Sequence, residues 1–309
     1  IKRVRDCMSP QNSISVKTSV YDAIIHLFNF DLGTLIVVEN EKLVGIISRK
    51  DLLKATLNKK NIEPIVMLTA YDALFARLFD DYADIILVGD SLNMSFNAQK
   101  DTLNLSVEAM KYHVKAVRAG LKRALLVADM PFGSYFNKNS ALKNAAKFIK
   151  AGADAVKLEG GERIAPTIAR LTSEGIAVMG HVGLRPQQVR FEGGYKIKGR
   201  GEDAENLIQD ALAIEHAGAF SAVIEGTVSS VAAKIARSVQ IPIIGIGAGA
   251  GVDGQVLVWS DMLGFLENFR PKFAKRYLDG AKLVREAVQI YANEVKMRKF
   301  PSAEFEYEE

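Results

Sequence analysis

Residues 85–90 read IILVGD, a short apolar run that ends in a carboxylate, and the same arrangement recurs along the chain. The other copies are ALLVAD at 124–129, AVKLE at 155–159 and AVIE at 222–225. In a parallel β/α protein, the carboxyl ends of successive strands meet on one face, where their side chains form the active site. The recurrence therefore predicts an enzyme.

Further short apolar runs alternate with helical stretches from Pro64 onward. The eight candidate strands, rich in Val and Ile and bounded by Gly or Asp, are IVML, IILV, ALLVA, AVKL, AVMG, AVI, PIIGI and QVLV. Such runs suit a parallel sheet that is buried on both faces. Eight β/α units over roughly 250 residues predict an α/β fold, the (β/α)8 TIM barrel. An open doubly wound sheet is the alternative.

The helical stretches between the runs carry their own end signals. Three of them end in Ala-Gly, at 119–120, 151–152 and 217–218. Glycine readily adopts the left-handed conformation that closes many helices. We therefore expect glycine C-caps at all three positions.

Residues 1–60 follow a different pattern, that of a small α+β segment. A loop, a helix, two strands and a second helix are expected at 8–19, 20–30, 35–39, 42–48 and from Arg49. The helical and apolar patterns of the barrel begin only after the polar residues 59–63. We therefore expect two domains, a segment at 1–60 and a barrel domain at 61–309.

This first segment resembles a CBS module. Met8-Ser9-Pro10 is similar to the start of the module, and GIISRKD at 45–51 is similar to its closing motif. The resemblance implies that Ser48 and Asp51 contact the ribose and phosphate of an adenosine nucleotide. CBS modules normally share a nucleotide cleft in pairs, and the sequence contains no second copy. The segment therefore either pairs with another chain or is a vestige or an artificial fusion.

Composition and charge restrict the class of protein. The 309 residues are 49% apolar and 25% charged, as in ordinary globular proteins. The net charge of +4 is small and the basic residues are scattered, which argues against a nucleic-acid partner and favours a small-molecule substrate. The single cysteine, Cys7, excludes an internal disulfide framework and fits a reducing compartment.

Targeting signals are the next consideration. No apolar run approaches the roughly 18–20 residues of a membrane span, and no apolar signal core follows the opening IKRVRDCMSP. We therefore expect a cytoplasmic protein without a membrane partner. Because the chain begins at Ile1 rather than at a methionine, we expect its natural start to lie upstream.

Asp90, Asp129 and Glu159 follow neighbouring candidate strands and are predicted to form a metal site. Three carboxylates make an oxygen-only cluster, which suits a hard cation such as Mg2+. The cation would act as a Lewis acid on a carbonyl group. The alternative for any single Asp at a strand end is a helix N-cap.

Three further side chains complete the candidate site. Lys157 lies two residues before Glu159 and points to the same side of its strand, where we expect it to hold a substrate carboxylate or enolate; a structural salt bridge to Glu159 is the alternative. Glu225 ends the sixth candidate strand, across the barrel, and is placed to remove a proton from the carbon beside a carbonyl. His181 either hydrogen-bonds the substrate or is a structural histidine.

Two glycine-rich stretches lie outside this cluster. Residues 245–251, GIGAGAG, follow the seventh candidate strand, where barrels often bind phosphate through backbone N–H groups. Close packing is the other explanation for these glycines. Residues 191–201, FEGGYKIKGRG, form a long loop after the fifth strand, either a lid over the barrel mouth or a flexible surface loop.

From about Pro64 to Pro301 the chain resembles the ketopantoate hydroxymethyltransferase family. The similarity is carried by MLTAYDALFA at 67–76, ILVGDSLNM at 86–94, ADMPFGSY at 128–135, AVKLEGG at 155–161, GHVGLRPQ at 180–187, GGYKIKGRG at 193–201 and IPIIGIGAG at 241–249. These segments are long and occur in a fixed order, so the resemblance is specific.

The resemblance implies a Mg2+-dependent barrel that transfers a one-carbon unit from methylenetetrahydrofolate to 3-methyl-2-oxobutanoate, giving ketopantoate for pantothenate and coenzyme A biosynthesis. It implies that Asp90, Asp129 and Glu159 hold the metal and that Glu225 accepts the proton. The implied oxoacid contacts are Asp90, Ser91, Asp129 and Lys157. The role of Ser91 rests on the resemblance alone. The family is decameric, which implies a homo-oligomer, although CBS-like sequence here replaces the family's short N-terminal helix.

Other interpretations remain open at this point. Inosine monophosphate dehydrogenase also combines CBS modules with a barrel, but it needs a catalytic cysteine there, and Cys7 lies outside the barrel. Carbon–carbon lyases related to phosphoenolpyruvate mutase use a cysteine-bearing loop that this barrel lacks. An adenosine-nucleotide-sensing regulatory protein, or an artificial fusion with an impaired barrel, is the remaining alternative.

Overall fold

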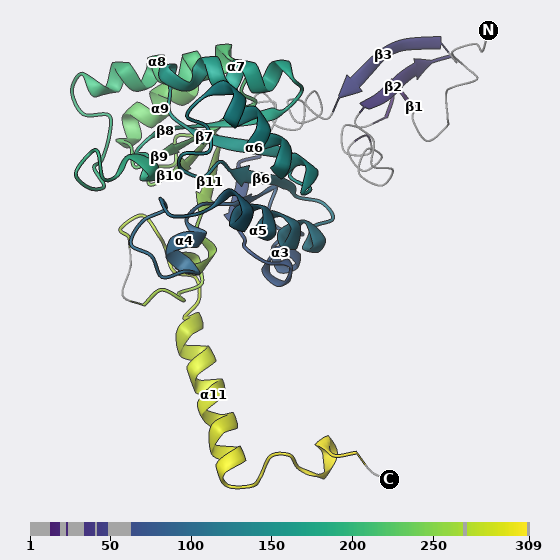
Figure 1. Ribbon diagram of the computed structural model, residues 1–309, viewed down its shortest axis with the longest axis vertical. Helices are drawn as coiled ribbons and strands as arrows, with labels where there is room; N and C mark the ends of the chain where they lie inside the picture. Colours follow the sequence, from purple (N-terminus) through teal and green to yellow (C-terminus); the bar gives the residue numbers. More distant parts are fainter. Residues whose placement is uncertain are drawn as a thin grey trace. The chain divides into compact units, whose positions relative to one another are not determined.

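The computed structural model of the chain describes residues 13–18, 23, 34–40, 42–48, 63–267 and 271–307. Eight strands form a closed barrel in the order β10-β11-β4-β5-β6-β7-β8-β9 (Figure 1). They are β4 (Ile65–Thr69), β5 (Ile85–Val88), β6 (Leu125–Asp129), β7 (Ala155–Glu159), β8 (Ala177–Gly183), β9 (Ser221–Glu225), β10 (Ile243–Ile246) and β11 (Gly254–Leu257). From β4 through β9 and β10 to β11 each strand pairs in parallel with the next, and β11 closes the barrel beside β4. The predicted TIM barrel is confirmed, and the open sheet is wrong.

Helices connect the barrel strands and surround them (Figure 1). They are α3 (Ala73–Phe79), α4 (Leu92–Ser95), α5 (Val107–Gly120), α6 (Lys138–Lys150), α7 (Ala165–Ser173), α8 (Asp203–His216) and α9 (Ser229–Ser238), with 3-10 turns η3 (Glu162–Ile164) and η4 (Pro186–Gln188). Side chains cap the N-termini of three of them, α3, α5 and α6. Ser106 accepts a hydrogen bond from the Ala109 N–H of α5, and Asn137 and Ser140 form a capping box on α6.

Two of the three predicted glycine caps are confirmed. Gly152 and Gly218 have φ angles of +108° and +92°, in the region that favours glycine. The prediction is wrong for Gly120, which is the last residue of α5. A Cβ atom there would lie 2.4 Å from the carbonyl oxygen of Ala73, so this glycine permits the close approach of α5 to α3.

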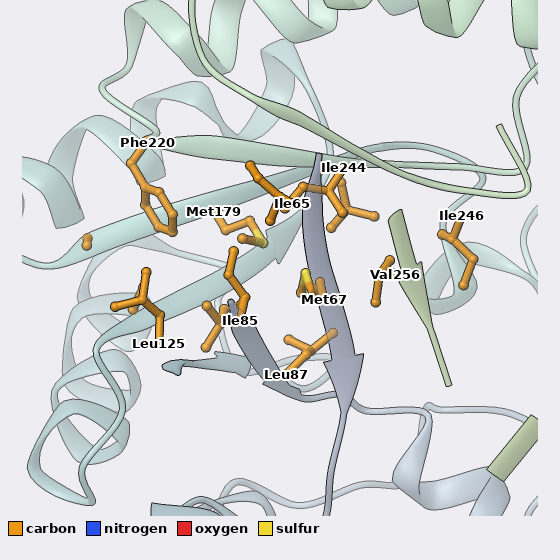
Figure 2. Close-up of a cluster of buried hydrophobic side chains, with 14 residues drawn as sticks. Ile65, Met67, Ile85, Leu87, Leu125, Met179, Phe220, Ile244, Ile246 and Val256 are labelled. Carbon is orange, nitrogen blue, oxygen red and sulfur yellow. The ribbon is translucent and has the colours of Figure 1, made fainter. Parts of the chain in front are cut away.

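Apolar side chains from all eight strands fill the barrel interior (Figure 2). The cluster consists of Ile65, Met67, Ile85, Leu87, Leu125, Val127, Ala155, Ala177, Met179, Phe220, Val223, Ile244, Ile246 and Val256. Many of its members are two positions apart on one strand, because alternate side chains of a strand share a face. The interior is therefore a packed core rather than a channel.

The same alternation places polar side chains at the carboxyl ends of the strands. A core residue is followed two positions later by an ionisable one in four cases: Val127 by Asp129, Ala155 by Lys157, Met179 by His181 and Val223 by Glu225. Because residues two apart point the same way, these ionisable groups lie above the core on the inside of the barrel. The geometry that fills the core thus also assembles the site.

The N-terminal segment contains a second sheet of β1 (Ser13–Ser15), β2 (Thr34–Glu39) and β3 (Lys42–Ser48), in that order. The antiparallel pair β2–β3 confirms the two predicted strands. β1 corrects the predicted loop. It pairs in parallel with β2, and Ile14 is buried in a cluster with Leu35, so backbone pairing and apolar burial outweigh the polar composition around it.

Several predictions for this segment lie outside the described residues. They concern Cys7, Met8-Ser9-Pro10, Asp51, most of the helix at 20–30, the helix from Arg49 and the domain boundary at residue 60. Ser48 is the last residue of β3. Its role and that of Asp51 stay predictions.

Residues 257–309 form a second compact unit. Its described helices are α10 (Trp259–Met262), α11 (Gly280–Lys296) and the 3-10 turn η5 (Ala303–Phe305). The rings of Trp259 and Phe265 pack with centroids 5.4 Å apart. In the part of the chain that the structure describes, no helix has both the length and the apolar character that crossing a membrane requires.

Candidate active site

Six ionisable side chains gather at the carboxyl ends of the barrel strands. Asp129, Glu159 and Glu225 end β6, β7 and β9, Lys157 and His181 lie within β7 and β8, and Asp90 follows β5. All except Glu225 are at most 4% exposed. The structure therefore brings together the acids, the lysine and the histidine that the sequence singled out.

Lys157 lies at the centre of this group and is paired with Asp129. Its Nζ atom is 2.7 Å from Asp129 Oδ1 and 3.2 Å from His181 Nδ1. Burial lowers the pKa of Lys157, but Asp129, Glu159 and Asp90 together outweigh it and raise the pKa above the ordinary lysine value. Lys157 is therefore a fixed positive charge, and its ion pair is with Asp129 rather than with Glu159.

His181 links the two sides of the mouth. Its Nδ1 atom is 3.4 Å from Glu159 Oε1, and its Nε2 atom is 3.4 Å from Glu225 Oε2. Burial and the charge of Lys157 lower the pKa of His181, but the two carboxylates prevail and raise it to about 9. The imidazole thus connects Glu225 to Glu159 at the end of β7.

Asp90 occupies the least favourable position for a negative charge. Burial raises the pKa of Asp90 well above its usual value, and repulsion from Asp129 and Glu159 raises it further. Lys157 and Gln187 oppose this effect. Because three carboxylates are buried together, an added cation at this position would relieve their repulsion.

Gln187 and Tyr135 hold the carboxylates in place, and the sequence argument gave neither of them a role. The Gln187 side-chain amide donates to Asp90 Oδ2 at 2.8 Å and to the Met130 carbonyl at 2.9 Å, while its backbone N–H donates to Glu159 Oε2 at 3.1 Å. The Tyr135 hydroxyl donates to Gln187 Oε1 at 2.6 Å. Both residues lie in segments that carried the family resemblance, which was the available signal.

The donor set fits the predicted metal in its chemistry. Three buried carboxylates offer the oxygen ligands that Mg2+ prefers. Asp129 Oδ1 and Glu159 Oε1 are buried; Asp129 Oδ1 has the Lys157 ammonium at 2.7 Å and Glu159 Oε1 has His181 Nδ1 at 3.4 Å, but neither contact has hydrogen-bond geometry. The arrangement itself is less complete: among the described residues, no three His, Cys, Asp or Glu side chains surround one point as metal ligands. The metal role of these residues stays a proposal.

Comparison with known proteins identifies the family. The model for ketopantoate hydroxymethyltransferase matches residues 50–303. The 3-methyl-2-oxobutanoate hydroxymethyltransferase of Campylobacter concisus (strain 13826) is 62% identical over 252 residues, which cover 81% of this chain and 93% of that protein. The chain belongs to the ketopantoate hydroxymethyltransferase family. A further member, from Helicobacter pylori (strain Shi470), is 54% identical over 255 residues, which cover 81% of this chain and 94% of that protein.

Membership of the ketopantoate hydroxymethyltransferase family makes the chain a transferase and sets aside the dehydrogenase and lyase alternatives. A CBS domain model matches residues 4–58, which confirms the second resemblance. Solved structures of phosphonopyruvate hydrolase (TM-score 0.55, 15% identity, 84% of this chain and 93% of that chain) and 2,3-dimethylmalate lyase (TM-score 0.53, 14% identity, 85% and 92%) are similar. At these identities the likeness shows the barrel fold alone.

Ser91, which the family resemblance alone singled out, lies beside the cluster. It precedes α4, and its hydroxyl is 2.9 Å from the hydroxyl of the buried Tyr71. Ser91 is half-buried, and its hydrogen bond with Tyr71 fixes the orientation of its hydroxyl. This places a hydroxyl next to Asp90, and the role of Ser91 in binding the oxoacid stays a prediction.

The loop at 191–201 is held by a contact beyond β9 and by an ion pair within the loop itself. Lys198 pairs with Thr227 beyond β9 and forms an ion pair with Glu192 at 2.7 Å. Tyr195 is half exposed, and burial followed by the charge of Glu225 raises the pKa of its hydroxyl. Tyr195 thus lies near the acidic cluster, as a lid residue would, and the lid role stays a prediction.

Three of the four glycines at 245–251, Gly245, Gly249 and Gly251, approach neighbouring atoms closely. A Cβ atom at Gly249 would lie 2.5 Å from Cβ of Ser229, and one at Gly251 would lie 2.7 Å from Cβ of Ala233. Both contacts are with α9. Close packing therefore accounts for these glycines without a phosphate ligand.

Proposed function

We propose that this enzyme transfers a hydroxymethyl group from methylenetetrahydrofolate to 3-methyl-2-oxobutanoate with the help of Mg2+, giving 2-dehydropantoate for pantothenate and coenzyme A synthesis. The observation that carries the proposal is the buried group of Asp90, Asp129 and Glu159 around Lys157, with Glu225 on the far side of His181. Relatives named 3-methyl-2-oxobutanoate hydroxymethyltransferase at 54–62% identity support the substrate assignment.

In this proposal Asp90, Asp129 and Glu159 hold Mg2+. When bound, the ion supplies Lewis-acid polarisation of the substrate's keto group. The raised pKa of Asp90 supports the assignment, because the mutual repulsion that causes part of it is what a divalent cation would offset.

Lys157 and Glu225 then have complementary tasks. Lys157 keeps its charge because its carboxylate neighbours raise its pKa, so it binds the negative charge of the oxoacid carboxylate or of the developing enolate. Glu225 takes the proton from C3 of the oxoacid, and His181, 3.4 Å from it, orients the accepting carboxylate. Ser91 contributes a further hydrogen bond to the oxoacid, and a hydrogen bond from His181 to the oxoacid is the alternative to its orienting Glu225.

The reaction balances with one molecule of water. C3 gives its proton to Glu225 and forms a carbon–carbon bond to the methylene carbon of the donor. Both bonds from that carbon to the donor nitrogens break, water supplies the hydroxyl group, and tetrahydrofolate leaves with the protons. The protein's contribution is to form the C3 carbanion equivalent beside the donor.

The test is solvent deuterium exchange at C3 of 3-methyl-2-oxobutanoate, followed by NMR with Mg2+ and without folate. Glu225→Gln should abolish the exchange and leave oxoacid binding nearly intact, and Asp129→Ala should abolish metal-dependent binding. Glu205→Gln is the control, since Glu205 lies exposed on α8. Exchange at the wild-type rate in Glu225→Gln would remove Glu225 from the base role.

The remaining assignments belong to the same proposal. A cytoplasmic location and a homo-oligomer are expected for an enzyme of this family, and residues 1–60 are proposed as a domain distinct from the barrel at 61–309. The CBS match at 4–58 makes adenosine-nucleotide regulation through Ser48 and Asp51 a second candidate function. Addition of AMP or ATP to the transfer assay tests it, and an unchanged rate with both nucleotides would contradict it.

A further inference from the structure

A pocket beside the carboxylate cluster has no task in the steps proposed so far. Its lining consists of Phe132, Tyr135, Phe136, Glu159, Arg163, Gln187 and Gln188. These residues come from the segments that follow β6, β7 and β8, all at the carboxyl end of the barrel. The enclosed space is about 40 Å3, and the hollow of about 330 Å3 around it includes open solvent in front of the pocket. Because Glu159 forms part of the wall, a ligand in this pocket would lie directly beside the site of the oxoacid.

Two phenylalanines give the pocket an aromatic wall. The rings of Phe132 and Phe136 pack edge to face, with centroids 5.3 Å apart. Their side chains are 44% and 71% exposed, so both keep aromatic surface available to a ligand. Leaving such surface in water is unfavourable, and a flat conjugated ring would cover it.

Two polar side chains of the lining are uncommitted. Neither the Arg163 guanidinium nor the Gln188 amide forms an ion pair or a side-chain hydrogen bond with any residue in the described ranges. Tyr135 and Gln187, in contrast, are engaged with each other. Gln188 offers a donor and an acceptor to the edge of a heteroaromatic ring, and the exposed Arg163 offers a cation to an anionic group at the solvent side.

We infer that this pocket binds the one-carbon carrier, with its conjugated ring system against Phe132 and Phe136 and its carboxylate tail on Arg163. The inference rests on the proposed function, which requires a second reactant next to the oxoacid. A ring, an amide-like edge and a negative tail are the three features that this lining matches, and a reduced folate has all of them. The small oxoacid has no ring and needs none of these groups.

The experiment separates the two halves of the reaction. Phe136→Ala and Arg163→Gln are assayed for full transfer at saturating oxoacid with varied methylenetetrahydrofolate, and for folate-free C3 exchange. Each should raise the KM for the carrier about tenfold and leave C3 exchange and the KM for the oxoacid within about twofold. Tyr82→Ala and Arg170→Gln are matched controls, since Tyr82 is 77% exposed and Arg170 pairs with Glu174 on α7.

Direct titration of tetrahydrofolate into wild-type enzyme and both variants gives a second readout that does not need turnover. Weaker binding in the variants, with unchanged exchange, supports the pocket. An unchanged carrier KM, a raised oxoacid KM, or a changed oligomeric state in the variants would each overturn it. Failure of the proposed function looks different, because the wild-type enzyme itself would then show neither C3 exchange nor transfer.

Discussion

Replacing Lys157 by methionine removes the positive charge from the centre of the carboxylate cluster while keeping a side chain of similar length. The Lys157 Nζ to Asp129 Oδ1 distance of 2.7 Å corresponds to an attraction of about 6 kcal/mol at an effective dielectric constant of about 20. The variant avoids the cost of burying an ammonium group, which offsets part of this loss. Breaking a buried pair from one side typically costs about 3–5 kcal/mol, because the remaining charge stays buried and unpaired.

We therefore expect Lys157→Met to lower the free energy of unfolding by about 3–5 kcal/mol in metal-free buffer, measured by urea denaturation followed by circular dichroism. Lys111→Met is the matched control. Its ammonium pairs with Glu108 on the surface, at 3.3 Å, and such pairs contribute little. The control should be indistinguishable from wild type.

Two additions make the reasoning refutable. Asp129→Asn in the Lys157→Met background should restore part of the lost stability, because it removes the carboxylate left without a partner. Mg2+ should also restore stability in Lys157→Met if the remaining carboxylates bind the ion. Equal stability of Lys157→Met and Lys111→Met would show that the cluster does not depend on this charge.

Three further outcomes follow from individual contacts. Gln187→Leu removes the side-chain hydrogen bonds to Asp90, Met130 and Tyr135, and should destabilise the protein by about 2–4 kcal/mol in urea unfolding and slow C3 exchange. Tyr135→Phe removes only the bond to Gln187 among these and should cost about 1 kcal/mol. Equal effects of the two variants would contradict the role given to these hydrogen bonds. Burial raises the pKa of Asp261 to about 6 from 3.8, so its charged form opposes folding. The free energy of unfolding of Asp261→Asn should equal that of wild type near pH 3.5 and exceed it by on the order of 2–3 kcal/mol above pH 7. A variant that is more stable than wild type only at acidic pH would contradict this sign. Gly120→Ala should lower the free energy of unfolding by about 1–3 kcal/mol, because its methyl would meet the Ala73 carbonyl, and a thermal melt at wild-type temperature would refute the contact.

The barrel could be predicted from the sequence because its strands are short, apolar and ended by recognisable residues. Runs such as IILV at 85–88 are buried at every position, so composition alone marks them as interior strands. The position of Asp129 and Glu159 followed from the same rule, since parallel strands all end on one face. Strand alternation then placed Lys157 on the same side as Glu159.

The supporting contacts could not be predicted in this way, because they depend on how loops fold back over the barrel. Gln187 contacts Asp90, 97 positions away in the sequence, through a 3-10 turn that has no periodic pattern. The partner of Lys157 was also ambiguous: Glu159 is nearer in sequence, yet pairing across the β6–β7 ladder sets Lys157 opposite Asp129. Likewise, an Ala-Gly pair does not reveal whether its glycine turns the chain, as Gly152 does, or admits a neighbouring helix, as Gly120 does.

The charge balance of the mouth explains why the two sides of the candidate site depend on each other. Asp90, Asp129 and Glu159 are buried against one permanent cation, Lys157, and the pKa of Asp90 is raised first by burial and then by repulsion from the other two carboxylates. His181 adds positive charge to the group, because Glu159 and Glu225 raise its pKa. A divalent cation bound to the three acids would weaken the attraction between Glu159 and His181, so that the imidazole would interact mainly with Glu225. The proposed metal would therefore act on both the oxoacid and, through His181, the proposed base Glu225.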